Sequence, residues 1–258
     1  MSSLILTQNG SVACVRLNRP DVRNAFNDAL ITELGDTFAK LEKDAACRVV
    51  ILSGEGNFFC AGADLNWMKS FVGASQETNE ADARRLARLL LSLDHFPKPL
   101  IVQARGAAIG GGVGLVAVAD IAIASDDMVF ALAEVKLGLI PAVISPFVIG
   151  KMGASLARRY FLTGERFKAD VALRCGLIHE VVVADQLESR ALELAKELLS
   201  SGPEALKASK ELIREVKETA NLQIENYTVK KIASLRVSPE GQEGIKAFLE
   251  KRKPNWNA

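Results

Sequence analysis

A carboxylate in front of a long uncharged stretch is the residue of this sequence that most suggests chemistry. Glu134 is followed, after Lys136, by fourteen residues without a charge, 137–150. Burial among such residues would raise the pKa of a carboxyl toward the range that is useful for donating and accepting protons. A salt bridge from Glu134 to Lys136 or to another cation is the alternative, and the residue alone does not decide between the two.

A cluster of glycines precedes this carboxylate. Five of the nine residues from 106 to 114 are glycine: Gly106, Gly110, Gly111, Gly112 and Gly114. Each glycine inside a helix costs about 1 kcal/mol relative to alanine, so the cluster indicates a backbone in close contact with something else. Residues 112–117 also fit the dinucleotide pattern G-x-G-x-x-A, which needs a strand running directly into the glycines. Six residues, 104–109, separate the predicted strand from Gly110, and this disfavours a dinucleotide site.

Small residues also gather between 59 and 65, where the sequence reads Phe-Cys-Ala-Gly-Ala-Asp-Leu. They follow a predicted strand and lead into a predicted helix, so a ligand could approach the backbone closely and accept hydrogen bonds from it. A tight turn with Asp64 as the N-cap of the helix explains the same residues without a ligand. Both interpretations stay open at this point.

The histidines and cysteines form no recognisable catalytic or metal-binding motif. His95 and His179 are 84 positions apart with no carboxylate cluster around either, so neither a histidine-built metal site nor a Ser-His-Asp triad is expected. The four cysteines, Cys14, Cys47, Cys60 and Cys175, show no C-x-x-C pairing. The N-terminal residues lack the pattern of a signal peptide, which predicts reduced thiols and a cytoplasmic protein.

The charge balance excludes other classes of protein. Lys and Arg number 32 against 31 Asp and Glu, a net charge of +1, so bulk charge does not predict binding to nucleic acid or to an anionic membrane. The longest uncharged runs, 106–119 and 137–150, have 14 residues each and are too short to cross a bilayer, which takes roughly 20.

The first two hundred residues alternate between strand and helix patterns. Runs of β-branched or alternating apolar residues predict strands at 4–7, 12–17, 49–52, 100–103 and 121–124. Apolar residues spaced by three and four predict helices at 28–43 and 78–96. An Asn9-Gly10 turn joins the first two strands. Such alternation predicts an α/β fold with largely parallel strands.

After Asp185 the pattern is helical only. The predicted helices span 187–199, 203–218, about 222–234, and 239–250, and Pro203 and Pro239 suit a first helical turn. We therefore predict two parts: residues 1–200 form the core that carries the site, and residues 201–258 form a helical section that covers the core and mediates assembly.

Taken in order, these segments resemble the enoyl-CoA hydratase/isomerase, or crotonase, superfamily, and the resemblance covers essentially the whole chain. It rests on Asn18-Arg-Pro followed by Asn24-Ala25, on Cys60–Leu65, on Gly106–Leu115, on Glu134–Pro141, and on Asp120-Ile-Ala-Ile-Ala and Leu162-Thr-Gly. Each motif is weak alone, but the ordered set at this spacing is specific.

The resemblance implies a spiral of ββα units with a helical C-terminal section, a homotrimer or dimer of trimers, an acyl-CoA substrate, and no metal or redox cofactor. In this family two backbone N–H groups bind the thioester oxygen, and on this chain they match Ala63 and Gly111. Aligned donors of this kind hold the charge that reaches the oxygen as the α-carbon gains carbanion character. Glu134 matches a catalytic glutamate. The positions that match the substrate path are Arg23, Ala25, Ala61, Asp64, Leu65, Gly110, Gly114 and Pro141.

The chain departs from the family pattern at two places. Hydratases of this family usually have a second glutamate in the glycine cluster, and Gly114 occupies that position here. Many members have P-G-x-G-G where this chain reads Pro141-Ala-Val-Ile-Ser145. Because this segment borders the acyl pocket, unusual acyl specificity is expected, and we expect space beside Gly114 that could accommodate a branch of the substrate.

Three functions are compatible with these residues. Within the superfamily the chain looks most like 3-methylglutaconyl-CoA hydratases of leucine degradation, which implies a lyase that adds water to an enoyl-CoA. A Δ3,Δ2-enoyl-CoA isomerase needs only one carboxylate, and a non-catalytic acyl-CoA-binding relative needs none. If the substrate carries a distal carboxylate, Lys69, Ser145 and Tyr160 are candidates to bind it.

Overall fold

The main sheet of the protein has six strands in the order β1-β2-β3-β4-β6-β9. A computed structural model describes residues 2–218, 229, 232, 234 and 238–257. Strands β1 (Leu4–Asn9) and β2 (Val12–Leu17) form the predicted antiparallel hairpin, with Gly10 at φ +57° in its turn. Strands β3 (Val49–Gly54), β4 (Leu100–Ala104), β6 (Ile121–Ser125) and β9 (Glu180–Val182) then add in parallel.

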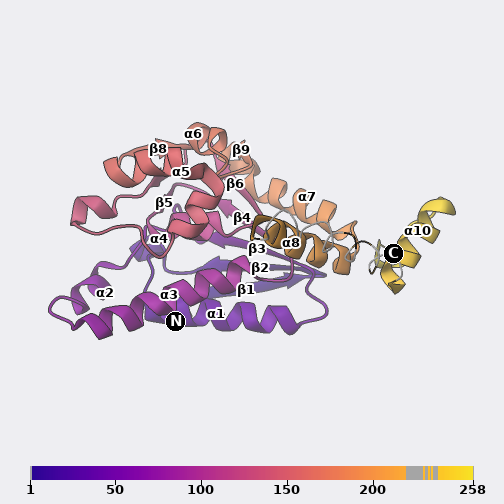
Figure 1. Ribbon diagram of the computed structural model, residues 1–258, viewed down its shortest axis with the longest axis horizontal. Helices are drawn as coiled ribbons and strands as arrows, with labels where there is room; N and C mark the ends of the chain where they lie inside the picture. Colours follow the sequence, from indigo (N-terminus) through magenta and orange to yellow (C-terminus); the bar gives the residue numbers. More distant parts are fainter. Residues whose placement is uncertain (1, 219–228, 230–231, 233, 235–237, 258) are drawn as a thin grey trace.

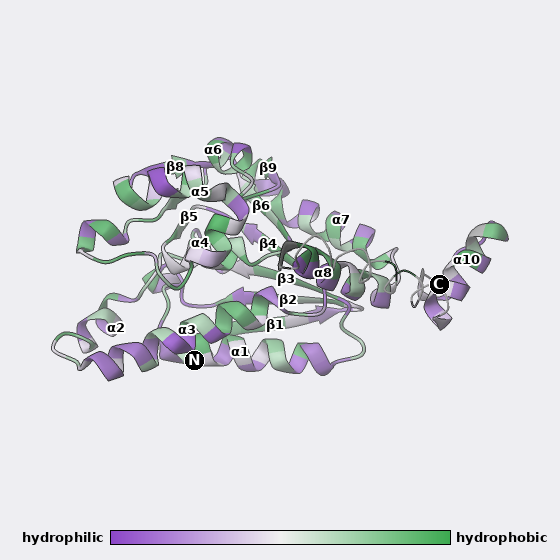
Figure 2. Cartoon of the chain, in the orientation of Figure 1, coloured by the Kyte–Doolittle hydropathy of each residue, from purple (hydrophilic) through white to green (hydrophobic). Residues whose placement is uncertain are grey.

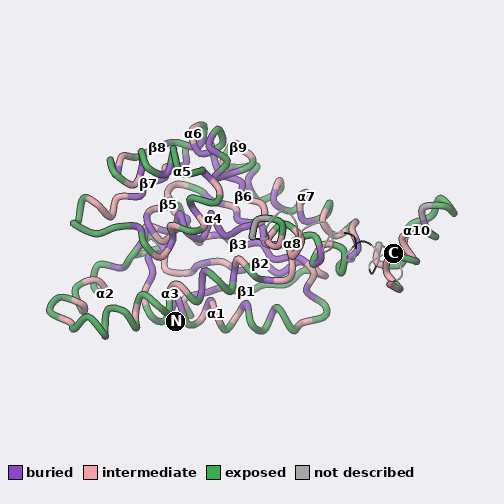
Figure 3. Tube along the Cα trace, viewed as in Figure 1, coloured by how far each residue is buried: buried purple, intermediate pink, exposed green. Residues whose placement is uncertain are grey.

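Helices cover both faces of this sheet. Along β3, Val50 and Leu52 point into the larger core with α1 (Asp28–Lys43) and α3 (Gln76–Asp94), whereas Val49 and Ile51 point to the opposite face. There they pack with α7 (Leu187–Leu199). Burial on both faces explains why the parallel strands read as nearly continuous apolar runs. Figure 3 shows the strands buried and the outer surfaces of the helices exposed, and Figure 2 shows polar residues on those same surfaces.

A second, smaller sheet lies beside the first and contains β5 (Ala107–Ile109), β7 (Val129–Ala131) and β8 (Arg166–Lys168). The chain reaches it repeatedly: β4 leads to β5 and then to helix α4 (Gly111–Ala117), and β6 leads to β7 and then to helix α5 (Ser145–Thr163). Each of these two turns of the chain therefore adds one strand to the large sheet, one to the small sheet and one helix (Figure 1). This is the ββα spiral that the sequence predicted.

Most of the long periodic elements agree with the sequence prediction, whereas the short strands and helix α5 were missed. Helices α1 and α7 have the predicted bounds, and β1 to β4 and β6 differ by at most three residues at an end. The three-residue strands β5, β7, β8 and β9 were not predicted, nor were α4, the 19-residue helix α5 and α6 (Ala169–Arg174). Helix α2 (Leu65–Ser70) begins where a helix was predicted to start after Asp64. Three residues are too few to show a period. Because β5 ends at Ile109, a strand does lead directly to Gly110, and the spacing argument against a dinucleotide site was wrong on that point.

The C-terminal helices that the structure describes are α8 (Pro203–Glu218) and α10 (Pro239–Leu249). Helix α8 is tied to the core by Lys210, whose Nζ lies 2.5 Å from Asp120 Oδ2. Helix α10 lies at the opposite end of the molecule from α2 (Figure 1), and Glu240 accepts hydrogen bonds from the first amides of α8. The helix predicted over about 222–234 lies mostly outside the described residues, and the division at residue 200 stays a prediction. No helix in the described part is long and apolar enough to span a membrane.

Candidate active site

The three chemistry-bearing segments meet at one edge of the small sheet. Residue Ala63 forms a parallel bridge with Phe26, and Cys60 forms a parallel bridge with Ala108 of β5. Strand β5 in turn pairs in parallel with β7. Because adjacent parallel segments end on the same side, the residues that follow them come together there. That edge presents Ala63, then Gly110 and Gly111 after β5, then Glu134 after β7.

The amides of Ala63 and Gly111 are available to a ligand. Phe26 donates to Gly62 O at 2.7 Å and accepts from Asp64 N at 2.8 Å, so the intervening Ala63 N–H points away from this pairing. Gly111 is the first residue of α4, where an amide has no acceptor within the helix. Neither N–H donates to a protein group within the described residues. Two unused amides at adjacent strand ends have the character that an oxyanion site needs.

Glycine is required at two positions around the Gly111 amide. Gly110 has φ +49°, and a Cβ placed on it would lie 2.9 Å from Glu134 Oε1. A Cβ on Gly112 would lie 2.5 Å from the carbonyl oxygen of Cys60. The glycine cluster therefore lets α4 begin close to the neighbouring strand and lets the Glu134 carboxylate lie beside the start of this helix.

Glu134 begins a short 3₁₀ helix, Glu134–Leu137, and is half-buried. Its Oε2 is buried and has no hydrogen-bond partner among the described residues. Burial raises the pKa of the Glu134 carboxyl above its ordinary value, while a hydrogen bond from its own backbone lowers it to a smaller extent. No ion pair with Lys136 forms, so the salt-bridge alternative is wrong. A carboxyl with a raised pKa and one oxygen without a hydrogen-bond partner among the described residues is suited to moving protons.

The position of the second glutamate of the family is closed by Ile144. A Cβ on Gly114 would lie 2.5 Å from Ile144 Cγ2, 3.2 Å from Ile144 Cβ and 3.4 Å from Leu90 Cδ1. Gly114 is buried, and Ile144 is only 3% exposed. The open space that we expected beside Gly114 is absent, because Ile144 occupies it. Direct contact between Gly114 and substrate therefore has no support from this geometry.

Both carboxylate oxygens of Asp64 accept hydrogen bonds from other residues of the protein. Its Oδ1 accepts from Asn66 N at 2.8 Å and Trp67 N at 3.3 Å at the start of α2, and its Oδ2 accepts from Arg19 Nη2 at 2.7 Å. Burial raises the pKa of Asp64, but the hydrogen bonds from Arg19 and the two amides outweigh it, and the pKa lies below its ordinary value. The N-cap interpretation is confirmed. The backbone of Asp64 is also in use, because its N–H donates to Phe26 O and its carbonyl accepts from Met68 N, both at 2.8 Å.

Arg19 and Asn24 are supporting residues that the sequence analysis did not single out. The guanidinium of Arg19 also donates to Ala25 O, so it joins residues 24–26 to the segment that carries Ala63. Asn24 is fully buried with φ +56°, and its Nδ2 donates to Glu55 O at 2.9 Å and Phe58 O at 2.7 Å. The signal was present in the Asn-Arg-Pro and Asn-Ala motifs. It was overlooked because neither residue is of an obvious catalytic type.

The remaining predicted positions differ in exposure. Arg23 is exposed and lies over the Phe58 ring, with its Cζ 5.0 Å from the ring centroid. Leu65 is 73% exposed and Ala61 is partly exposed, whereas Ala25 and Pro141 are buried. The exposed members are accessible to a long ligand.

The three candidates for binding a distal carboxylate differ in burial and in contacts. Tyr160 is buried in the core, with its ring centroid 4.2 Å from that of Phe167, so its assignment was wrong. Ser145 follows Ile144 and donates from Oγ to Ala142 O at 2.8 Å. Lys69 is exposed in the last turn of α2. Ser145 and Lys69 remain candidates.

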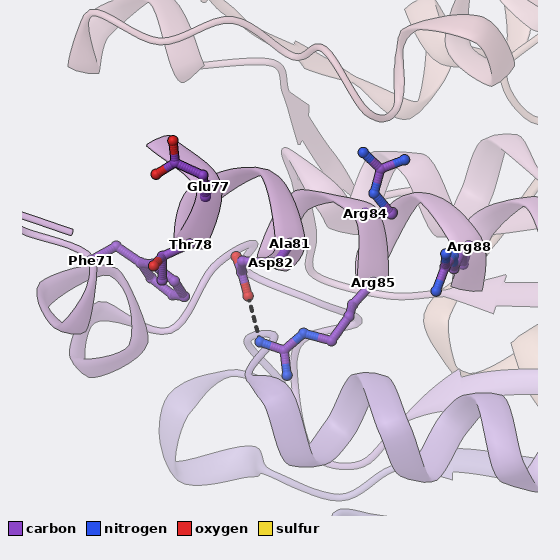
Figure 4. Close-up of a pocket in the computed structure, with 8 residues that line it drawn as sticks. All are labelled: Phe71, Glu77, Thr78, Ala81, Asp82, Arg84, Arg85 and Arg88. Atoms are coloured by element: carbon purple, nitrogen blue, oxygen red, sulfur yellow. Dashed lines mark hydrogen bonds and ion pairs between the residues drawn. The ribbon is translucent and has the colours of Figure 1, made fainter. Parts of the chain in front are cut away.

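A surface groove of about 620 Å³ lies elsewhere, along the exposed face of α3 (Figure 4). Arg85 bridges Asp82 and Asp28 there, at 2.9 and 2.7 Å. The opposite face of α3 is the one that contacts the glycine cluster, through Leu86 and Leu90. The groove contains none of the predicted site residues and is separate from the site.

Other titratable groups have structural roles. Cys60 is fully buried, which raises the pKa of its thiol to about 12, and all four cysteines are free. His179 Nδ1 accepts from Ala122 N at 2.9 Å, and burial lowers its pKa. No group of three metal-ligating side chains occurs among the described residues.

A model of the enoyl-CoA hydratase/isomerase family matches residues 7–258. The chain belongs to this family. It is 35% identical over 260 residues to the 2,3-dehydroadipyl-CoA hydratase of Escherichia coli K12, covering 99% of each chain. It is 37% identical over 265 residues to the carnitinyl-CoA dehydratase of Proteus mirabilis, covering 98% of each.

Solved structures agree with this assignment. The enoyl-CoA hydratase of Shewanella pealeana superimposes with a TM-score of 0.95 at 44% identity, covering 98% of this chain and 96% of the other. The protein therefore has the crotonase fold and is a hydratase-type enzyme that acts on acyl-CoA thioesters.

Proposed function

We propose that this enzyme of the enoyl-CoA hydratase/isomerase family adds water to 3-methylglutaconyl-CoA, a reaction of leucine degradation. The observation that carries the chemistry is the half-buried Glu134 carboxyl beside Gly110, at the edge where the Ala63 and Gly111 amides are unused. Glu134 Oε2 has no hydrogen-bond partner among the described residues. A proton-transfer group and two donors at one edge are what addition to a conjugated thioester requires.

The Ala63 and Gly111 amides activate the substrate in this proposal. Their N–H groups donate to the thioester oxygen, which becomes more negative as water attacks the β-carbon and the α-carbon gains charge. Because the backbone holds both donors in place, little reorganisation accompanies the reaction, and removal of one such donor in other enzymes costs roughly 10²–10³ in rate.

Glu134 moves both protons. The ionised carboxylate takes a proton from water as its oxygen bonds to the β-carbon, and it returns a proton to the α-carbon. Ile144 occupies the position of a second glutamate. The other carboxylate of the described site, Asp64, is held by Arg19 and by two amides at the start of α2, so it does not share these steps. A distal carboxylate on the substrate would help orient the water, which favours a glutaconyl-type substrate over a straight-chain one.

An isomerase is the second candidate, and the Gly114–Ile144 contact favours it. Moving a proton between the α- and γ-carbons of a 3-enoyl-CoA needs one carboxylate and the same oxyanion donors. Glu134 supplies that carboxylate without a water molecule.

A substrate panel with purified protein tests the proposal. Hydration of 3-methylglutaconyl-CoA removes the absorption of its conjugated thioester, and isomerisation of a 3-enoyl-CoA creates that absorption. We expect hydration of 3-methylglutaconyl-CoA to exceed that of crotonyl-CoA at least tenfold in kcat/KM. Equal hydration of the two would exclude assistance by the substrate's carboxylate. Isomerisation without hydration would establish the second candidate, and binding without either reaction would establish a non-catalytic relative.

A homotrimer or dimer of trimers in the cytoplasm completes the proposal, without a metal or redox cofactor. Exposed apolar side chains on the C-terminal helices support assembly: Ile213 and Val216 on α8, and Ile245 and Leu249 on α10. Light scattering that gave only the 27.8 kDa mass of one chain would exclude an oligomer.

A further inference from the structure

The two departures from the family pattern contact each other. Gly114 lies in the buried helix α4, and Ile144 lies directly before α5. Thirty positions separate them in the sequence, yet a Cβ on Gly114 would come within 2.5 Å of Ile144 Cγ2. Real carbon atoms do not approach this closely, so no residue with a side chain fits at 114 while Ile144 keeps its place.

The two departures change the size of the residue in opposite directions. Where the family pattern has a glutamate, this chain has Gly114, and where the pattern P-G-x-G-G has its second glycine, this chain has Ile144. A large residue has been lost from one side of the contact and gained on the other.

Ile144 is held firmly in this position. Its backbone lies in a turn in which Ser145 N donates to Ala142 O at 3.2 Å, and its carbonyl accepts from Val148 N at 3.1 Å in the first turn of α5. The β-branched side chain has few accessible rotamers and cannot easily turn away. The Ile144 side chain therefore keeps a fixed position against Gly114.

We propose that Ile144 is a specificity-determining residue of this enzyme: together with Gly114 it fills the place of a second carboxylate, and it restricts the site to substrates that Glu134 alone can turn over. This inference rests on the proposed function. According to this inference, a straight-chain enoyl-CoA is a poor substrate because of Ile144 as well as because of the glycine at position 114.

The steric half of the proposal is tested by thermal unfolding. Alanine is a better helix former than glycine, so Gly114→Ala would stabilise α4 if its surroundings were open. We expect Gly114→Ala to lower the melting temperature by about 5 °C in the wild type. Added to Ile144→Ala, the same substitution should raise the melting temperature, because the new methyl group fills the cavity left by the truncated side chain. Ile144→Val is the matched control: it keeps Cγ2, so Gly114→Ala should remain destabilising in that background.

The functional half uses crotonyl-CoA, which has no distal carboxylate. The double variant Gly114→Glu/Ile144→Gly restores the family pattern, and we expect its kcat/KM for crotonyl-CoA hydration to exceed that of the wild type at least tenfold. Gly114→Glu/Ile144→Val should show no gain, because Cγ2 still blocks the new carboxylate.

The inference is overturned if Gly114→Ala changes the melting temperature equally in all three backgrounds. It is also overturned if the glutamate at 114 gives the same gain whether or not Cγ2 is present, or no gain once Cγ2 is removed. Failure of the proposed function is a separate result, namely wild-type protein that hydrates none of the enoyl-CoAs, and the unfolding measurements do not depend on it.

Discussion

The two sheets of this protein divide the work between them. The central strands β3, β4 and β6 of the six-stranded sheet have five or six residues each and are buried on both faces, where their side chains join the apolar core. The three-stranded sheet has strands of three residues, and its edge presents amides and one carboxyl. Long buried strands stabilise the fold, whereas short strands that end together leave backbone groups unpaired where a substrate can use them. The contrast predicts that substitutions in the large sheet affect stability and those at the small-sheet edge affect turnover.

The largest expected effect is at Glu134. Glu134→Gln keeps the size of the side chain and removes its titratable proton, so kcat should fall by about 10²–10⁴ with a smaller change in KM. Steady-state kinetics on the best substrate measure this. Asp82→Asn, in the groove on the outer face of α3, is a control that should keep kcat within about twofold. Wild-type kcat in Glu134→Gln would refute the assignment.

The pH profile follows from the same group. Glu134 must be ionised to accept a proton from water, and burial raises its pKa. The rate should therefore fall as pH decreases, with a midpoint above the ordinary pKa of a glutamate, and Glu134→Gln should lack this acidic limb. An acidic limb that persists unchanged in the variant would assign it to another group.

A substitution at Gly111 tests the backbone donor. A Cβ at this position would lie 3.0 Å from the Phe26 ring, so Gly111→Val should displace the start of α4 and lower kcat by about 10²–10³. Gly35→Ala in α1 adds a Cβ that meets only Leu89 Cδ1 at 3.9 Å, and it should leave kcat unchanged. A well-folded Gly111→Val protein with an unchanged rate would contradict the proposed oxyanion site.

Leu52→Ala in β3 tests the other side of the comparison. Leu52 is fully buried in the large sheet, so truncation should cost about 2–5 kcal/mol of unfolding free energy. The kcat per folded molecule should stay within about twofold of the wild type. Chemical denaturation and kinetics below the unfolding transition measure both quantities, and a large loss of kcat would show that the two sheets are not functionally separate.

The smallest expected effect is the change in folding stability when the Glu134 carboxyl is removed. A carboxyl whose pKa is higher in the folded than in the unfolded protein binds protons more tightly when folded, so its charge opposes folding above the ordinary glutamate pKa. Glu134→Gln should therefore melt a few degrees higher than the wild type at neutral pH. This advantage should shrink as the pH falls from the raised pKa of the folded protein to the ordinary glutamate pKa. Lower stability of Glu134→Gln at neutral pH would mean that the ionised carboxylate has a stabilising partner.

The sequence by itself determined most of the long elements, with the exception of α5, and the types of residue at the site. Periodic apolar spacing defined α1 and α7, and buried runs defined β3 and β4, because many side chains repeat the same signal over several turns or alternations. The glycine cluster and Glu134 were recognisable by residue type, and their order along the chain indicated the family.

Only the tertiary structure decided which groups are free and which are used. Asp64 resembles a ligand in sequence, but Arg19, 45 positions away, engages its carboxylate. Gly114 resembles an opening, but Ile144 fills it from another helix. In sequence Glu134 resembles an ion-pair partner of Lys136, but the two do not pair. Glycine is required at Gly110, which lies beside the Glu134 carboxylate, because its φ is positive. These outcomes depend on contacts between segments distant in the sequence, and local propensity contains no information about the atoms that folding brings to the same place.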